Sequence, residues 1–124
     1  MPRLNKAVPT FIVSDVTATT KWYADNLGFT VHPFPKDPPY VFASIIKDDI
    51  ELMLMLIDDY QKPDLSRQRP SGLWDAYIRM TGVEQFYEEL RSKVEIKLPL
   101  TRRPYGDMEF EVKDPNGYIL VFSE

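Results

Sequence analysis

The pattern of apolar residues occurs twice in this chain, and this internal repeat is the strongest constraint on its fold. Four helix-spaced residues in each half correspond with one constant offset of 67 positions: Val16, Thr19, Thr20 and Tyr23 match Val83, Phe86, Tyr87 and Leu90. The turn at residues 48–50 matches residues 116–118 with an offset of 68. The match is one of pattern rather than identity, and it predicts two modules of equal architecture.

Residues 108–122 are typical of a β-hairpin. Met108, Phe110 and Val112 alternate with charged residues, which is the period of a half-buried strand. The turn at residues 114–117 follows, in which proline fixes one backbone angle and Asn-Gly tolerates positive φ. The apolar residues 118–122 then form a second strand. The chain is therefore expected to close with two antiparallel strands.

Each half has the order strand, helix and three strands. In module one, about residues 6–58, we expect a strand at Val8–Ser14, a helix capped by Asp15 and ended by Gly28, a strand at Phe29–Phe34, and a hairpin of Tyr40–Lys47 and Ile50–Ile57. In module two, about residues 72–124, we expect a strand at Leu73–Met80, a helix with a capping box of Thr81 and Glu84, a short strand at Val94–Leu98, a loop at Pro99–Pro104, and the closing hairpin. A polar linker at about residues 59–71 joins them. The expected fold is one α+β domain, residues 1–124, of two tandem βαβββ modules.

The composition excludes several classes of function. The chain has 124 residues, no cysteine and a net charge of −4. Disulfides, thiolate nucleophiles and cysteine metal sites are therefore excluded, and nucleic acid is not an expected partner. No signal-peptide pattern is present, and no apolar run approaches the roughly 20 residues that span a bilayer. We expect a cytoplasmic protein without a membrane partner.

Several short motifs resemble the vicinal-oxygen-chelate superfamily, which includes glyoxalase I, bleomycin-resistance proteins, fosfomycin-resistance enzymes and extradiol dioxygenases. The matching motifs are Val13–Val16, Trp22–Tyr23, Asn26–Phe29, Tyr105–Gly106 and Asp114–Tyr118. The resemblance implies that the two modules form a curled mixed sheet with an open cleft and with the helices on its outer face. It also implies a homodimer, because many members dimerise. The most similar branch is that of the bleomycin-resistance-like members that use no metal.

The resemblance also assigns four cleft positions at which metal-using members commonly carry His, Glu or Gln. These positions fall here on Val8, Met53, Asp75 and Val121. Valine cannot bind a cation, and a thioether sulfur is a poor ligand for hard divalent ions. One carboxylate does not make a catalytic metal site, which needs about three protein ligands. We therefore expect no metal and no other cofactor.

Strand alternation predicts which side chains line the cleft. The aliphatic face of each strand, such as Leu52 and Leu54 in the first module, is expected to pack on the helices, and the other face to line the cleft. The predicted ligand-binding residues are Thr10, Ile12, Met53, Met55, Asp75, Tyr77, Arg79, Glu109, Glu111 and Val121. Apolar groups with a few polar anchors are typical of a small-molecule site, and the acidic groups favour a cationic ligand.

The leading hypothesis is a metal-independent protein that sequesters a small organic ligand, as in the bleomycin-resistance branch. The alternative is a metal-dependent lyase, isomerase or dioxygenase of the glyoxalase type. Its divalent metal would need ligands from this set: Asp75, Glu51, Glu109, Glu111 and the single histidine, His32. A third interpretation is an interaction domain whose cleft is filled. No nucleophile motif or phosphate-binding loop is present, so no catalytic residue is assigned.

Overall fold

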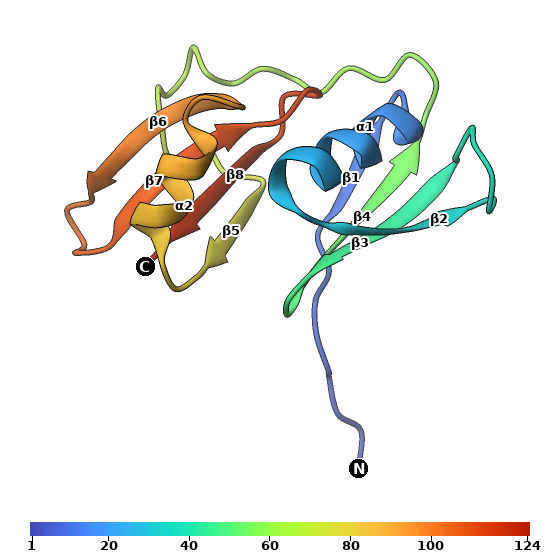
Figure 1. The fold of residues 1–124 in the computed structure, drawn as a ribbon, viewed down its shortest axis with the longest axis horizontal. Helices are drawn as coiled ribbons and strands as arrows, with labels where there is room; N and C mark the ends of the chain where they lie inside the picture. The colour runs from blue at the N-terminus through green and yellow to red at the C-terminus, as the bar shows by residue number, and fades with distance from the viewer.

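The computed structural model describes residues 1–124 and contains two four-stranded sheets, each with a helix on one side (Figure 1). Module one contains β1 (Thr10–Val13), α1 (Val16–Trp22) continued by a π-helical turn (Tyr23–Leu27), β2 (Thr30–Phe34), β3 (Phe42–Lys47) and β4 (Ile50–Leu56). Module two contains β5 (Ala76–Arg79), α2 (Val83–Leu90), β6 (Glu95–Arg102), β7 (Met108–Lys113) and β8 (Ile119–Ser123). The strand orders are β1-β4-β3-β2 and β5-β8-β7-β6. The predicted α+β fold of two tandem βαβββ modules is thus confirmed.

The first helical segment begins and ends where the sequence predicts. The Asp15 carboxylate accepts a hydrogen bond from the backbone N–H of Ala18 at 2.9 Å, which satisfies a donor that the first helical turn leaves free. Gly28 ends the segment with a φ of 78°, a left-handed conformation that glycine adopts at no steric cost. Both signals come from residues close together in the chain, and for this reason the ends of this helical segment can be predicted from the sequence.

The predicted capping box at the second helix is wrong. Gly82, with a φ of 87°, occupies the cap position of α2 in place of Thr81, and the helix has no side-chain cap of the kind that Thr81 and Glu84 would form. Glu124, directly after β8, instead accepts hydrogen bonds from the backbone N–H groups of Gly82 and Val83, both at 3.0 Å. A carboxylate from a distant strand therefore provides the negative charge that stabilises a helix N-terminus.

The strand after α2 is longer than predicted. β6 covers Glu95–Arg102, so it includes most of the segment Pro99–Pro104 that the sequence assigns to a loop, and does not stop at Leu98. Its pairing with β7 changes register between Leu98 and Thr101, at the position of the proline. β6 lies at the edge of its sheet. A bulged edge strand can include a proline because one of its sides has no strand to pair with.

The two modules contact each other through the turn that precedes β8. The Tyr118 ring stacks on Phe11 of β1 with ring centroids 4.2 Å apart, and its hydroxyl donates to the Ile12 carbonyl at 2.6 Å. Asp114 in the same turn accepts a 2.6 Å hydrogen bond from the buried hydroxyl of Tyr23 in the first module. The two sheets have no hydrogen-bonded strand pair in common. The curled sheet of the prediction therefore consists of two sheets connected by side chains.

The hydrophobic core lies between each sheet and its helix. Ten of its strand residues belong to the faces that the alternation assigns to packing: Phe11, Val13, Leu52, Leu54, Ala76, Ile78, Phe110, Val112, Leu120 and Phe122. The intervening residues of these strands consequently point to the opposite, inner face of each sheet. Neither helix has the length and apolar character that crossing a membrane requires.

Candidate ligand-binding site

The inner face of the first sheet carries four of the predicted site residues and is open. Thr10 pairs with Met53, and Ile12 pairs with Met55, across β1 and β4. Thr10 is exposed, Ile12 and Met53 are half-buried, and Met55 is 47% exposed. The part of this face that contains Ile12, Met53 and Met55 is therefore accessible and apolar.

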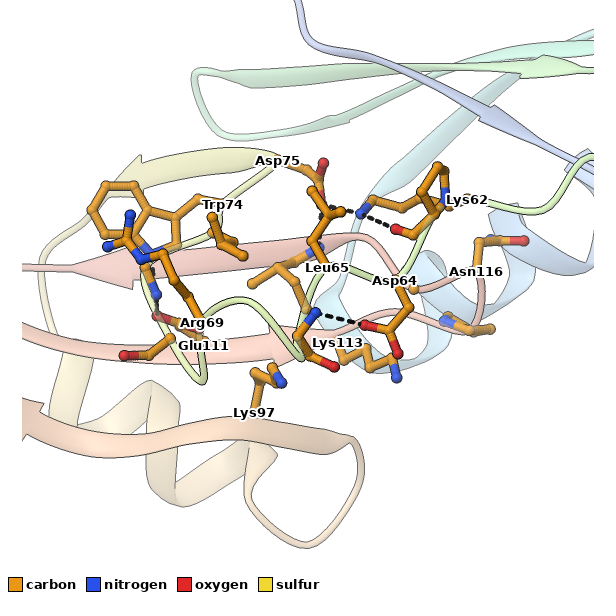
Figure 2. Close-up of a pocket in the computed structure, with 18 residues that line it drawn as sticks. Lys62, Asp64, Leu65, Arg69, Trp74, Asp75, Lys97, Glu111, Lys113 and Asn116 are labelled. Carbon is orange, nitrogen blue, oxygen red and sulfur yellow. Dashed lines mark hydrogen bonds and ion pairs between the residues drawn. The ribbon is translucent and has the colours of Figure 1, made fainter.

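The inner face of the second sheet is covered. Val121 pairs with both Tyr77 and Glu111, so these predicted site residues do share one face. Val121, Glu109 and Glu111 are nevertheless at most 1% exposed. The linker that follows β4 lies over the part of this face that contains Glu111 (Figure 2). Alternation along the strands gives the correct face, but it gives no information about what covers that face.

Glu109 is buried beneath two tyrosines. Its carboxylate accepts a hydrogen bond from the Tyr77 hydroxyl and another, of 2.7 Å, from the Tyr105 hydroxyl. Arg103 has its Nε atom 3.8 Å from the same carboxylate, and this Nε is buried without a hydrogen-bond partner. The two tyrosine hydrogen bonds and the nearby Arg103 charge fix the position of Glu109, so this acid is engaged within the protein.

Arg79 lies beside this cluster, and its ion pair is with Asp107 and not with a predicted acidic site residue. Its guanidinium pairs with Asp107 at 3.4 Å and lies over the Tyr77 ring, 5.2 Å from the ring centroid. The predicted site residues therefore separate into three places. Four lie on the open first sheet; Tyr77, Arg79, Glu109 and Val121 form or border the covered cluster; Asp75 and Glu111 line a cavity beside it.

Tyr77 on this face and Tyr118 at the module contact are expected to ionise at a higher pH than an ordinary tyrosine. Burial, together with the hydrogen bond to Glu109, raises the pKa of Tyr77 from 10.0 to about 12, and burial raises the pKa of Tyr118 to about 12. The folded state thus holds these protons more tightly than the unfolded state. Their contribution to stability is intact below pH 10 and is lost as the pH rises through about 12.

Absorbance titration should show that some tyrosines ionise in a late phase, and this phase should be smaller in Tyr77→Phe. Ionisation of all seven tyrosines in one step near pH 10 would contradict the raised pKa values.

Asp75 and Glu111 attach the linker to the second sheet. Glu111 accepts hydrogen bonds from the Gly72 backbone N–H at 3.2 Å and from the Trp74 indole N–H at 3.1 Å. Asp75 accepts a 2.8 Å hydrogen bond from the Ile119 backbone N–H and pairs with Lys62 at 3.3 Å. These contacts hold the two ends of residues 62–75 against the sheet and leave a space under the segment between them.

That space is a cavity of about 580 Å³ between the linker and the inner face of the second sheet (Figure 2). Its apolar lining residues are Leu65 of the linker, Leu73 and Trp74 between the linker and β5, and Ile119 of the sheet. Its charged lining residues are Lys62, Asp64, Arg69, Asp75, Lys97, Glu111 and Lys113. The volume lies within the range of roughly 300–1,000 Å³ that is usual for small-molecule sites.

The basic residues and the indole of this cavity are not among the residues predicted from the sequence. Lys113 follows Glu109 and Glu111 at alternate positions of β7, so the period-2 pattern contains a signal for it. Arg69 lies in the predicted linker, and Trp74 lies in the predicted strand Leu73–Met80, which in the structure begins only at Ala76. No local pattern predicts that this linker folds over a sheet, because the contacts that hold it there connect residues far apart in the chain.

The residues present do not fit the divalent metal that the resemblance associates with the fold. Of the four assigned positions, Val8, Met53 and Val121 have no oxygen or nitrogen donor, and Asp75 already binds Lys62. No three His, Cys, Asp or Glu side chains gather closely enough to hold an ion together. The acids proposed for the alternative are engaged elsewhere. Glu51, for example, accepts hydrogen bonds from lysine and serine side chains, which lower its pKa.

The paired βαβββ modules define the class of fold to which the chain belongs, and comparison with known proteins gives the family. The chain belongs to the Glyoxalase/Bleomycin resistance protein/Dioxygenase superfamily, whose family model matches residues 3–122. None of the curated protein sequences matches it significantly.

Solved structures of this superfamily are similar over nearly the whole chain. A bleomycin-binding protein from bleomycin-producing Streptomyces verticillus, in complex with copper(II)-bleomycin, has a TM-score of 0.71 and 25% identity, over 98% of this chain and 97% of that one. A bleomycin resistance determinant encoded on the transposon Tn5 has a TM-score of 0.72 and 17% identity, over 98% of both chains. A glyoxalase-related enzyme from Clostridium phytofermentans has a TM-score of 0.77 and 14% identity, over 99% and 96%. The last two likenesses concern the fold alone.

Proposed function

We propose that this protein is a metal-independent binding protein of the bleomycin-resistance type, which holds a small organic molecule without changing it chemically. The observation that carries the proposal is the cavity of about 580 Å³ over the inner face of the second sheet. It combines an exposed indole and leucines with fixed polar groups, which is the usual construction of a small-molecule site. The similar Streptomyces verticillus structure, named as a bleomycin-binding protein, supports the same class of function.

The alternative, a metal-dependent enzyme of the glyoxalase type, has less support in the residues. It requires about three protein ligands around an ion. The four acids considered for such a site, Glu51, Asp75, Glu109 and Glu111, are instead engaged with tyrosine, indole, lysine, serine and backbone donors. The neighbour named as a glyoxalase-related enzyme is 14% identical, so its similarity supports the fold and not an activity.

Three probes that differ in charge test the proposal. They are the neutral dye N-phenyl-1-naphthylamine, its anionic sulfonate 1-anilinonaphthalene-8-sulfonate, and the basic glycopeptide bleomycin. We expect at least one of them to bind with 1:1 stoichiometry, to change the fluorescence of Trp74, and to bind equally well with and without EDTA. A Trp74→Phe variant should lose the tryptophan signal, whereas Trp22→Phe, altered in α1 of the first module, should keep it. The proposal fails if none of the probes binds, or if binding depends on a stoichiometric metal that EDTA removes.

The open face of the first module supports the further proposal of a homodimer. A row of apolar side chains crosses all four strands, because Ile12 pairs with Met55, Met55 with Phe42, and Phe42 with Phe34. Phe34 is 65% exposed and Met55 47% exposed. A second copy of the chain would remove this apolar row from water.

The dimer is tested by its mass in solution. We expect sedimentation velocity to give a dimer for the wild-type protein and a monomer for Met55→Lys, which places a charge in the middle of the row. Leu65→Lys is the matched control, because Leu65 has a similar exposure of 49% but lies on the linker between the modules. A monomeric wild-type protein at high concentration would contradict the proposal.

A further inference from the structure

We infer that the cavity of the second module binds a small organic anion, with its charged group near Lys97, Lys113 and Arg69 and its apolar body against Trp74 and Leu65. This inference rests on the proposed function, and it names the chemical class of the ligand. It also differs from the cationic ligand that the acidic residues of the sequence suggest. The reason is that most of these acids are already engaged within the protein, whereas several cations are not.

Two of the three acids that line the cavity already have partners. Glu111 is 1% exposed and accepts hydrogen bonds from the Gly72 N–H and the Trp74 indole. Asp75 binds the Ile119 N–H at 2.8 Å and the Lys62 ammonium group at 3.3 Å. A cationic ligand would therefore have to displace contacts that hold the linker in place, and this would cost binding energy.

Three cations around the cavity, in contrast, are free to bind an anion. Arg69 and Lys97 make no ion pair with any carboxylate of the protein, and Lys113 reaches only Glu95, at 3.9 Å, on the edge strand. Lys97 comes from β6, Lys113 from β7 and Arg69 from the linker. The charges thus approach the cavity from both of its walls (Figure 2). Cations on two walls of a partly enclosed space, without a close carboxylate partner, favour a negative ligand.

The positive charges around the cavity also favour the ionised form of Asp64 on the linker. Hydrogen bonds from Ser66 lower the pKa of Asp64 most strongly, and the charges of Lys113 and Lys97 lower it further. Asp64 is exposed and forms no ion pair within 4 Å. A ligand anion can therefore approach the same two lysines more closely than this carboxylate does.

The apolar part of the ligand has a surface to contact. Trp74 is 39% exposed, although its indole N–H donates a hydrogen bond to the Glu111 carboxylate. The centroid of its ring lies 4.9 Å from that of the Tyr77 ring. Leu65, on the linker, is 49% exposed. A fixed aromatic ring beside unpaired cations recognises an aromatic or aliphatic body that bears a carboxylate, sulfonate or phosphate.

The test compares two dyes that differ by one charged group. 1-Anilinonaphthalene-8-sulfonate and N-phenyl-1-naphthylamine have the same rings, and only the first carries a sulfonate. We expect the anionic dye to bind at least about tenfold more tightly than the neutral one, since a hydrogen bond to a charged group commonly contributes that much. Its affinity should fall as salt concentration rises, whereas that of the neutral dye should not.

Substitutions of the lysines that line the cavity test whether these residues cause the preference for the anionic dye. Lys97→Gln and Lys113→Gln should each weaken the anionic dye by about tenfold and leave the neutral dye unchanged. Lys36→Gln is the matched control, because Lys36 is an exposed lysine in the loop between β2 and β3 of the first module. Circular dichroism checks that each variant is folded.

Equal affinity for both dyes in the wild-type protein would overturn the anion inference and leave the cavity as a binding site. An equal loss of affinity for the anionic dye in the Lys36→Gln control would do the same. Failure of both dyes and of bleomycin to bind would overturn the proposed function as well.

Discussion

Replacing Asp114 by alanine is expected to lower the free energy of unfolding by about 3–5 kcal/mol, because several buried donors lose their acceptor together. The Asp114 carboxylate accepts from the Tyr23 hydroxyl at 2.6 Å and from the backbone N–H groups of Asn116 and Tyr118 at 2.8 and 2.9 Å. Both Tyr23 and Asp114 are buried, so water cannot replace the lost contacts without a rearrangement. Urea denaturation measures the change.

Two further variants separate the contact between the modules from the local turn. Tyr23→Phe removes only the hydrogen bond from the first module and should cost about 1–2 kcal/mol. The double variant, Tyr23→Phe with Asp114→Ala, should cost less than the two single changes added together, because both remove the same hydrogen bond. A loss of less than about 0.5 kcal/mol in Asp114→Ala, the range of an ordinary surface substitution, would show that this residue does not connect the modules.

Replacing Glu111 by leucine is expected to weaken both dyes by about tenfold or more, because it releases the wall of the cavity. Glu111 holds the linker through the Gly72 N–H and the Trp74 indole. Leucine fills a similar volume but accepts no hydrogen bond, so the linker and the Trp74 ring lose their fixed position. Fluorescence titration with the neutral and the anionic dye measures the effect.

Glu111→Gln is the control for charge. The glutamine keeps an acceptor oxygen in the same place and removes the negative charge, so the neutral dye should bind as in the wild-type protein. The anionic dye should bind equally well or more tightly, because one repulsive charge near the cavity is lost. If Glu111→Leu binds both dyes as the wild-type protein does, the linker does not form the cavity wall.

The sequence contains the signals for the elements and faces of this fold but not for the segment that covers one of them. Hydrophobic periodicity correctly separates Leu52 and Leu54, which pack under α1, from Met53, which lies on the inner face. The same rule correctly pairs Val121 with Glu111 on one face. Its success follows from geometry, since alternate residues of a strand must point to opposite sides.

The failures concern contacts between residues distant in the chain. The cap of α2 comes from Glu124, more than forty positions beyond Gly82, so a local capping box could not reveal it. The burial of Glu111 depends on Gly72 and Trp74, which the linker brings to β7. The acidic residues of the inner face predict a cationic ligand, because the sequence does not reveal the distant contacts that engage these acids. The cavity itself presents Lys97, which has no carboxylate partner.

The most direct test of a metal-independent small-molecule site is a crystal structure of the protein with the tightest-binding of the three probes, grown in the presence of EDTA. We predict electron density for the probe between the linker and β6–β7, with Trp74 against its apolar part. Density for the probe only on the open first sheet near Met53 and Met55, or density for the probe in the cavity only when EDTA is left out and a metal ion is bound at Asp75, would contradict this proposal.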